Sequence, residues 1–178
     1  MSPLTYAKRA GLLRALADKL ESVEENAFSL KTWGETLRGE HSCRTTCCAI
    51  GYACFMDEFR EVGLRAITGM DEKCESFEEL LNWPAKFVTT VPAFEGHLSF
   101  NAISRLFGIS HAACGALFLN DAYDFRDAKE PHPKIVAKRL RAAATIMEDG
   151  SEEVKRVGAV AARRAIGSRI YGLRIKNG

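Results

Sequence analysis

The chain has 178 residues, of which 47 % are hydrophobic and 27 % charged, with six cysteines and a formal net charge of +2. This composition is too apolar for intrinsic disorder and too poor in glycine and proline for a low-complexity chain. A chain of this length can bury a core without disulfides or a metal. The longest apolar stretch, residues 47–56, is too short to span a membrane, and the N-terminus lacks a signal-peptide pattern. We therefore expect a cytoplasmic protein with reduced cysteines and no membrane contact.

The charge is unevenly distributed along the sequence. From Ser151 to Gly178, seven Lys or Arg residues oppose two glutamates, a net charge of +5, which leaves −3 for residues 1–150. A basic C-terminal segment indicates contact with a negative surface: the rest of the chain, a partner protein or nucleic acid. The simpler alternative is the solvated face of a terminal helix. The candidate residues for binding a partner or nucleic acid are Arg156, Arg163, Arg164, Arg169 and Arg174.

The first part of the chain predicts helices. Apolar residues at three- and four-residue intervals predict an amphipathic helix over about residues 3–25, with Ser2 as its cap. After an ordered connection, residues 45–56 predict a short helix that is buried nearly all round. We expect Asp57 to cap a further helical turn that Gly63 stops. The apolar stripe of the first helix comprises Ala10, Leu13, Leu16, Leu20 and Val23.

Between residues 65 and 92 the pattern is weaker. Residues 76–79 form a capping box, which predicts a short helix before Pro84. Residues 88–91 have the composition of a short strand, but no second strand of comparable strength is present to pair with it. A run of acidic residues in this region is either solvated or suited to a cation or a basic partner, although it lacks the spacing of a calcium loop. These residues are Asp71, Glu72, Glu75, Glu78 and Glu79.

The second half again predicts helices, over residues 98–107, which Gly108 stops, and over residues 111–119, which Ser110 caps. A third runs from Pro133 to Gly150, with a buried stripe at three- and four-residue spacing. The last helix is expected to start at Ser151. The stripe comprises Val136, Leu140, Ala143 and Met147.

Together these elements predict an all-α fold, a compact multi-helix domain with at most one short strand or hairpin. We divide the chain into a helical domain, residues 1–150, and a basic C-terminal helical extension, residues 151–178. One face of the extension is apolar, and two copies of the chain could form a homodimer through it. That face comprises Val154, Val157, Ala161 and Ala165.

Four thiols and an imidazole lie within fourteen positions, at His41, Cys43, Cys47, Cys48 and Cys54. A structural zinc site usually has two pairs of closely spaced ligands, and here only Cys43 and Cys47 form such a pair. Their four-residue spacing is also typical of two core-facing residues on a helix. A catalytic cysteine would need a lowered pKa and an oriented base, conditions that Cys43 meets only in part. His41, Cys43, Cys47 and Cys48 are therefore weak metal candidates, and we expect no cofactor and no enzymatic activity.

Residues 102–118 have the outline of a helix-turn-helix around Gly108, Ile109 and Ser110. In such a motif the second helix must present polar side chains to base edges, and here it offers only Ser110 and His111. A two-helix hairpin packed into the core explains the segment better. The chain also lacks the glycine-rich phosphate loops, the His-Glu-x-x-His motif and the Gly-x-Ser-x-Gly motif of common enzyme classes.

Four segments within about residues 28–147 carry a resemblance: residues 43–51, 59–64, 92–96 and 107–118. Their patterns, such as Cys-x-Thr-x-x-Cys-Ala-Ile-Gly and Phe-Gly-Ile followed by Leu-Phe, resemble a family of small uncharacterised proteins from bacteria and their phages. The chain departs from that family at Arg44, where relatives often have glycine, in the Ala-Cys-Gly-Ala stretch before Leu117, and in its basic C-terminal segment. The resemblance implies a helical fold and a mobile-element origin, and no particular reaction.

We therefore expect a non-enzymatic interaction protein, encoded by a phage or mobile element, that binds and modulates a host protein such as a defence component. The first alternative is a DNA-binding regulator that uses residues 102–118 and the basic C-terminal segment. The second is a cysteine-based zinc or thiol protein.

Overall fold

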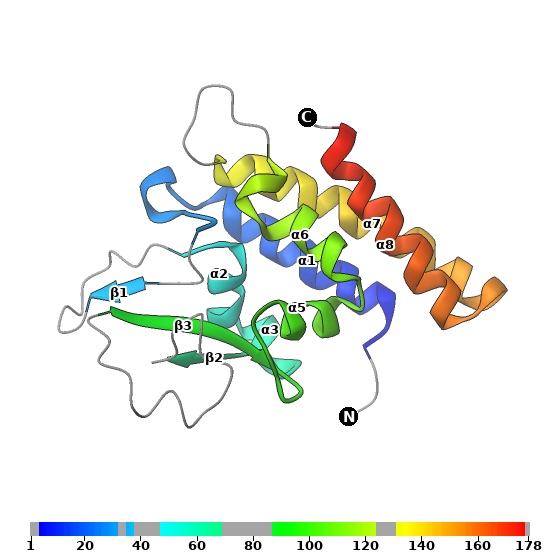
Figure 1. Ribbon diagram of the computed structural model, residues 1–178, viewed down its shortest axis with the longest axis horizontal. Helices are drawn as coiled ribbons and strands as arrows, with labels where there is room; N and C mark the ends of the chain where they lie inside the picture. Colours follow the sequence, from blue (N-terminus) through cyan, green and yellow to red (C-terminus); the bar gives the residue numbers. More distant parts are fainter. Residues whose placement is uncertain (1–3, 32–34, 38–46, 69–86, 124–130, 177–178) are drawn as a thin grey trace.

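The computed structural model describes residues 4–31, 35–37, 47–68, 87–123 and 131–176 (Figure 1). These ranges contain seven α-helices, two short 3₁₀ helices, Glu25–Ala27 and Asn120–Ala122, and a small antiparallel sheet. The expectation of a mainly helical fold is confirmed, but the sheet exceeds the single strand or hairpin that the sequence predicts. None of the described helices is long and apolar enough to cross a membrane. The predicted capping box at residues 76–79 and the acidic run at residues 71–79 lie outside the described residues.

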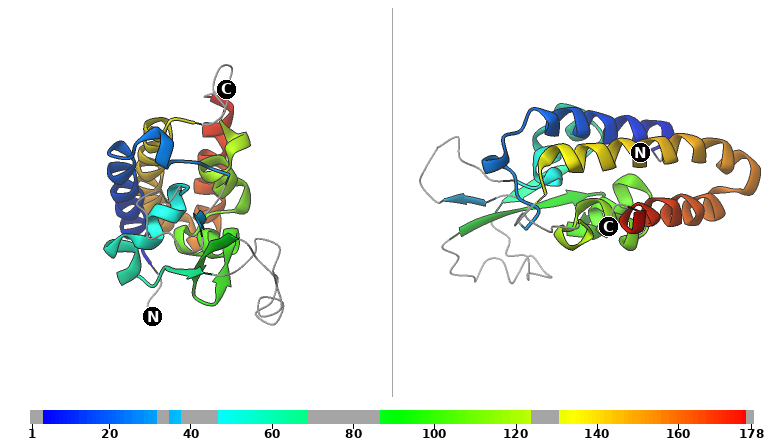
Figure 2. Two further views of the ribbon diagram at one scale, coloured as in Figure 1. Left: turned by 90° about the vertical axis from the view of Figure 1, so that its left-hand side faces the viewer. Right: turned by 90° about the horizontal axis from the view of Figure 1, so that it is seen from above.

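Three long helices contribute to one core, together with apolar residues of the shorter helices and of the sheet. Helix α1 (Tyr6–Glu21) packs along α7 (Pro133–Val157), and α8 (Ala159–Lys176) returns beside α7 (Figures 1 and 2). Helix α1 starts later than expected because the Thr5 hydroxyl accepts a hydrogen bond from the Lys8 amide and caps it. The predicted stripes are fully buried at Ala10, Leu13, Leu16 and Leu20 on α1 and at Val136, Leu140, Ala143 and Met147 on α7. Val23, the last predicted member of the first stripe, lies beyond the end of α1 and is only partly buried.

The prediction that a helix ends at Gly150 is wrong, because α7 continues to Val157. A Cβ atom at Gly150 would collide with the side chain of Ile166 on α8, so this glycine permits close helix packing and is not a stop. The break falls at Gly158, which has a left-handed φ of 87°. The face expected for a homodimer is therefore divided between two helices: Val154 and Val157 belong to α7, and Ala161 and Ala165 to α8.

Helix α8 is built into the same core as α1 and α7. Its residues Ala162, Ile166 and Ile170 are fully buried, and the helix packs against α7 and α6 (His111–Phe118). The charged residues of the C-terminal segment are divided between two helices: those up to Arg156 belong to α7, and those from Arg163 onward to α8, whose inner face is part of the core.

Four shorter helices lie beside the long ones: α2 (Ala49–Phe55), α3 (Asp57–Glu61), α5 (Ser99–Phe107) and α6. Helix α2 starts at Ala49, four residues later than predicted, because Cys48 is its cap and its Sγ accepts a hydrogen bond from the Gly51 amide at 3.4 Å. Asp57 is the first residue of α3 and makes no capping hydrogen bond, contrary to the prediction. The predicted stop at Gly108, with φ 64°, and the predicted cap at Ser110, which accepts from the Ala113 amide at 3.3 Å, are both confirmed.

The sheet is organised around one long strand, β3 (Phe87–Phe94), at the opposite end of the molecule from the α7–α8 connection (Figures 1 and 2). Strands β1 (Glu35–Leu37) and β2 (Arg65–Thr68) pair antiparallel with opposite edges of β3. Strand β4 (His97–Leu98) follows β3 through a two-residue turn, Glu95 and Gly96, in which both φ angles are positive. The expectation that β3 has no partner is wrong, since β1 and β2 both pair with it. These partner strands could not be predicted because they are too short to show an alternating apolar pattern in the sequence.

Candidate anion-binding groove

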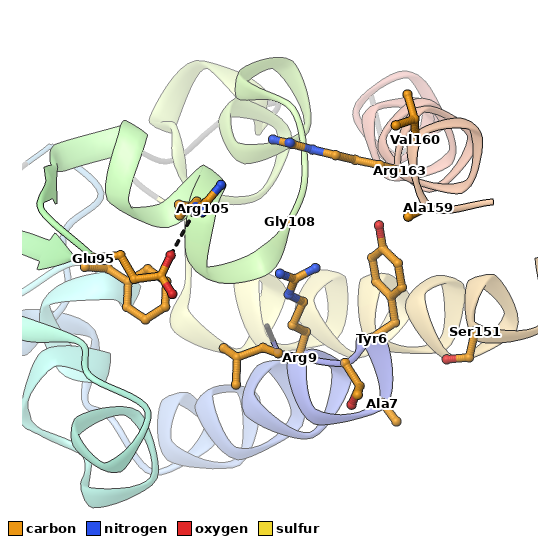
Figure 3. Close-up of a pocket in the computed structure, with 13 residues that line it drawn as sticks. Tyr6, Ala7, Arg9, Glu95, Arg105, Gly108, Ser151, Ala159, Val160 and Arg163 are labelled. Carbon is orange, nitrogen blue, oxygen red and sulfur yellow. Dashed lines mark hydrogen bonds and ion pairs between the residues drawn. The ribbon is translucent and has the colours of Figure 1, made fainter. Parts of the chain in front are cut away.

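A groove of about 1080 Å³ lies between the start of α1, the turn after α5 and the start of α8 (Figure 3). It is at the upper end of the size range of small-molecule sites, and it is also large enough for several residues of a peptide. Three arginines line it: Arg9 on α1, Arg105 on α5 and Arg163 on α8. Glu95 is the single carboxylate among the described lining residues. Apolar contributions to the walls come from Leu4, Ala7, Phe94, Ala159 and Val160.

The guanidinium of Arg9 is held in a defined position. Its Nε donates a hydrogen bond to the carbonyl of Leu106 at 3.1 Å, and its central carbon lies 5.3 Å from the centre of the Tyr6 ring. The guanidinium lies against the backbone of Gly108, where any Cβ atom would collide with it. Glycine at this position therefore serves two purposes, because it also allows the left-handed backbone that ends α5.

Arg163 approaches the same turn from the opposite helix. Its Nη2 lies 3.4 Å from the carbonyl oxygen of Ile109, a long hydrogen bond, and the side chain extends from α8 toward Gly108 (Figure 3). Arg105 is the third cation, and its Nε donates to Glu95 at 2.9 Å. In the part of the chain that the structure describes, neither Arg9 nor Arg163 forms an ion pair with a carboxylate.

The electrostatics of the groove favour an anion. Burial is the largest influence on the pKa of Arg9 and lowers it; the charges of Arg163 and Arg105 also lower it, whereas Tyr6 and Glu95 raise it. Arginine has so high a pKa that the side chain remains charged at neutral pH. Neighbouring cations repel, and an anion between them removes this repulsion. The arrangement is therefore suited to bind a negatively charged group.

The five arginines predicted to bind a partner do not form one site. Of these, Arg163 lines the groove, whereas Arg169 pairs with Asp149 on α7 at 2.8 Å. Arg156 and Arg164 are exposed to solvent. The side chain of Arg174 lies outside the described part of the structure. Sequence reasoning missed Arg9 and Arg105, because they lie on helices far from α8 in the chain and no motif links them.

The described cysteines are buried. Burial raises the pKa of Cys47 to about 11 and the pKa of Cys48, Cys54 and Cys114 to about 12. Metal binding and nucleophilic attack both require the thiolate, which these environments disfavour. Within the described ranges no group of three or more His, Cys, Asp or Glu residues is placed to hold a metal ion. The other two metal candidates, His41 and Cys43, are outside those ranges.

Residues 102–118 form the predicted two-helix hairpin, α5 and α6. The second helix is not free to enter a DNA groove along its length, since Ala113, Cys114 and Leu117 are fully buried and α6 packs against α8. The hydroxyl of Ser110, one of the two polar groups expected at base edges, is engaged as the helix cap.

Comparisons with protein-family models, with curated protein sequences and with solved structures find no match for this chain.

Proposed function

We propose that this protein is a non-enzymatic interaction protein that binds an acidic segment of a partner protein in the groove between α1, α5 and α8. The observation that carries the proposal is the convergence of Arg9 and Arg163 on one turn without a carboxylate partner in the described chain. Arginine clusters are a recurring means of recognising acidic motifs, because the planar guanidinium binds oxygen pairs through two parallel hydrogen bonds.

The walls of the groove suit a peptide that is both acidic and aliphatic. Val160, which lies beside Arg163 at the start of α8, is 73 % exposed, although aliphatic side chains are usually covered. A partner that places a carboxylate at Arg163 could cover Val160 with an aliphatic side chain. Such a combination of an apolar contact and a paired charge is typical of the central part of protein interfaces.

In this proposal the partner is a host protein, the chain is encoded by a phage or mobile element, and the complex forms in the cytoplasm. The support for this origin is the resemblance of the four segments within residues 28–147 to a family from bacteria and their phages. A defence component is one candidate partner, because mobile elements benefit when such a component is modulated.

A DNA-binding regulator is the second candidate. The observation that favours it is the exposure of Arg156, Arg163 and Arg164 to solvent. Exposed arginines bind phosphodiester backbones without sequence preference, and each contributes similarly to a salt-dependent affinity. The two candidates therefore differ in whether one arginine, Arg163, dominates binding.

The test compares two adjacent arginines on α8. R163Q removes a charge that lines the groove, and R164Q removes the same charge from a neighbouring residue that does not line it. Fluorescence anisotropy is measured at low salt with a labelled dodecapeptide that alternates Asp and Leu, with a Lys–Leu peptide as the control. We expect R163Q to weaken binding of the acidic peptide about tenfold or more, and R164Q less than about twofold.

Two results would contradict the proposal. If the acidic peptide binds the unmodified protein no better than the Lys–Leu peptide, the groove is not a site for acidic segments. If R163Q and R164Q weaken binding equally, general surface charge and not the groove is responsible. If the acidic peptide does not bind, and R163Q and R164Q weaken the binding of a random DNA duplex equally, the DNA-binding candidate is favoured.

A further inference from the structure

One donor of the groove, the guanidinium of Arg9, is oriented before any ligand arrives. The hydrogen bond from Arg9 Nε to Leu106 fixes the plane of the guanidinium, and no described residue accepts a hydrogen bond from either of its Nη atoms. A guanidinium that is already ordered loses little conformational entropy on binding. Arg163 is exposed and makes one long contact with the carbonyl of Ile109, which leaves most of its donor capacity unused. Both arginines thus contact the end of α5 and the turn that follows it, and both line the groove (Figure 3).

The charge of the lining indicates how many negative charges the ligand carries. Among the described lining residues, three arginines and one glutamate carry a net charge of +2 at neutral pH. A single carboxylate would neutralise only half of this. A phosphomonoester carries between about −1.5 and −2 at pH 7, and its three terminal oxygens can accept from two guanidiniums at once. Both the charge and the number of donors match one phosphate group.

Glu95 argues against a ligand with several phosphates in a row. Its carboxylate is 35 % exposed and lies in the groove, where it holds Arg105 at 2.9 Å. A second phosphate next to the first would meet this negative charge in place of a free cation. The site is therefore suited to an isolated phosphate and disfavours a nucleic-acid backbone.

From these observations, and resting on the proposed function of the groove, we infer that the partner segment is phosphorylated, with one phosphoserine or phosphothreonine bound between Arg9 and Arg163. The aliphatic wall formed by Val160 and Ala159 then contacts the residues that flank the phosphorylated one. Phosphorylation of the partner would switch binding on, because the unphosphorylated segment leaves the groove's charge uncompensated.

The experiment uses one dodecapeptide scaffold with aliphatic flanks and a central Ser, Asp or phosphoserine, measured by anisotropy against the full-length protein. We expect the phosphoserine peptide to bind at least about tenfold more tightly than the Asp peptide at pH 7.5. This preference should disappear in R163Q and remain in R164Q. It should also decrease as the pH falls from 7.5 to 5, through the second phosphate pKa of about 6, while Asp binding changes little.

Two further binding measurements test the number of phosphates and the need for a peptide. E95Q frees Arg105 and removes the repelling carboxylate, so we expect it to increase the affinity for a peptide with two adjacent phosphoserines more than for one with a single phosphoserine. Free O-phosphoserine should bind at least about tenfold more weakly than the phosphopeptide, because it lacks contacts to the aliphatic wall. Equal affinity would mean that the groove binds a small phosphorylated molecule and would overturn the peptide assignment.

The failures of the two proposals are distinguishable. If Asp and phosphoserine peptides bind equally well and both depend on Arg163, the groove binds acidic segments and the inference about phosphate is wrong. If the phosphate preference persists in R163Q, the phosphate binds elsewhere and the inference is also wrong. If neither peptide binds, the proposed function itself is refuted.

Discussion

Arg139 of α7 provides a direct test of how the fold is held together. The side chain is only 5 % exposed, and its Nη1 donates to the carbonyls of Ala116 at 2.9 Å and Ala122 at 2.7 Å. Its central carbon lies 3.8 Å from the centre of the Tyr123 ring. One cation thus joins α7 to the end of α6 and to the short helix that follows. We predict that R139M destabilises the protein strongly, although methionine has a similar length and no charge to bury.

The magnitude follows from these contacts. Each carbonyl loses a hydrogen bond from a charged donor, at about 1.5–3 kcal/mol, and the loss of the desolvated cation–π contact adds about 2 kcal/mol. Burial of the methionine side chain offsets about 2 kcal/mol of this. We therefore expect a net loss of about 3–6 kcal/mol. Arg141, two residues along the same helix, is the matched control, since its ion pairs with Asp18 and Glu21 are exposed and contribute less than about 1 kcal/mol in total.

Urea unfolding followed by circular dichroism measures both variants. With a slope of about 2 kcal/mol per molar urea, R139M should lower the midpoint by about 2 M and R141M by less than about 0.5 M. If R139M shifts the midpoint no more than R141M, the two carbonyls find other partners and the argument from burial is refuted.

Three further predictions concern glycines and a thiol. G108A should lower the free energy of unfolding by about 1–2 kcal/mol, because alanine is strained in the left-handed backbone, and should weaken phosphopeptide binding, because its Cβ displaces Arg9. In an R9A background G108A should still lower the stability, measured by urea unfolding, but should have no further effect on binding, measured by anisotropy. G150A, which would stabilise an isolated helix by about 1 kcal/mol, should destabilise this protein because the new Cβ would collide with Cδ1 and Cγ1 of Ile166. In an I166A background, which removes both of these atoms, G150A should no longer be destabilising. Burial raises the pKa of Cys114 from 9.0 to about 12, so the folded state favours the neutral thiol. The free energy of unfolding is therefore unaffected by this thiol below pH 9 and decreases as the pH rises toward 12. C114A should make this decrease smaller, as measured by urea unfolding over the same pH range.

The two glycines Gly108 and Gly150 show where prediction from the sequence succeeds and where it stops. Both follow an apolar helical stripe, and both predict a helix end. The prediction holds for Gly108, where the chain turns into the Ser110 cap, a signal that is local and visible in the sequence. It fails for Gly150, whose role depends on Ile166, a residue that comes close only after α8 folds back. Local signals were sufficient for the Gly108 stop, the Ser110 cap and most of the buried stripes, but not for the caps of α1, α2 and α3. Contacts between distant helices were not predictable from them.

The same limit explains the sheet and the groove. The partners of β3 are three and four residues long, and they become strands because β3 supplies their hydrogen bonds. The arginines of the groove come from three helices, and none of them is marked by its neighbours in the sequence. The sequence did indicate Arg163, by the excess of charge in the C-terminal segment, but not the site to which it belongs.

The structure also decides which experiment can test the basic segment. If residues 151–178 were only a charged extension, their deletion would be the direct test of the segment's role in binding. However, Ala162, Ile166 and Ile170 of this segment are fully buried in the core. Each buried isoleucine contributes about 1.5–3 kcal/mol, and the total stability of a typical domain is only about 5–15 kcal/mol. Deletion would therefore remove much of the stability of the fold, and a loss of binding would say nothing about the arginines. Single substitutions of Arg163 and Arg164 avoid this problem, because both residues are exposed and differ in whether they line the groove.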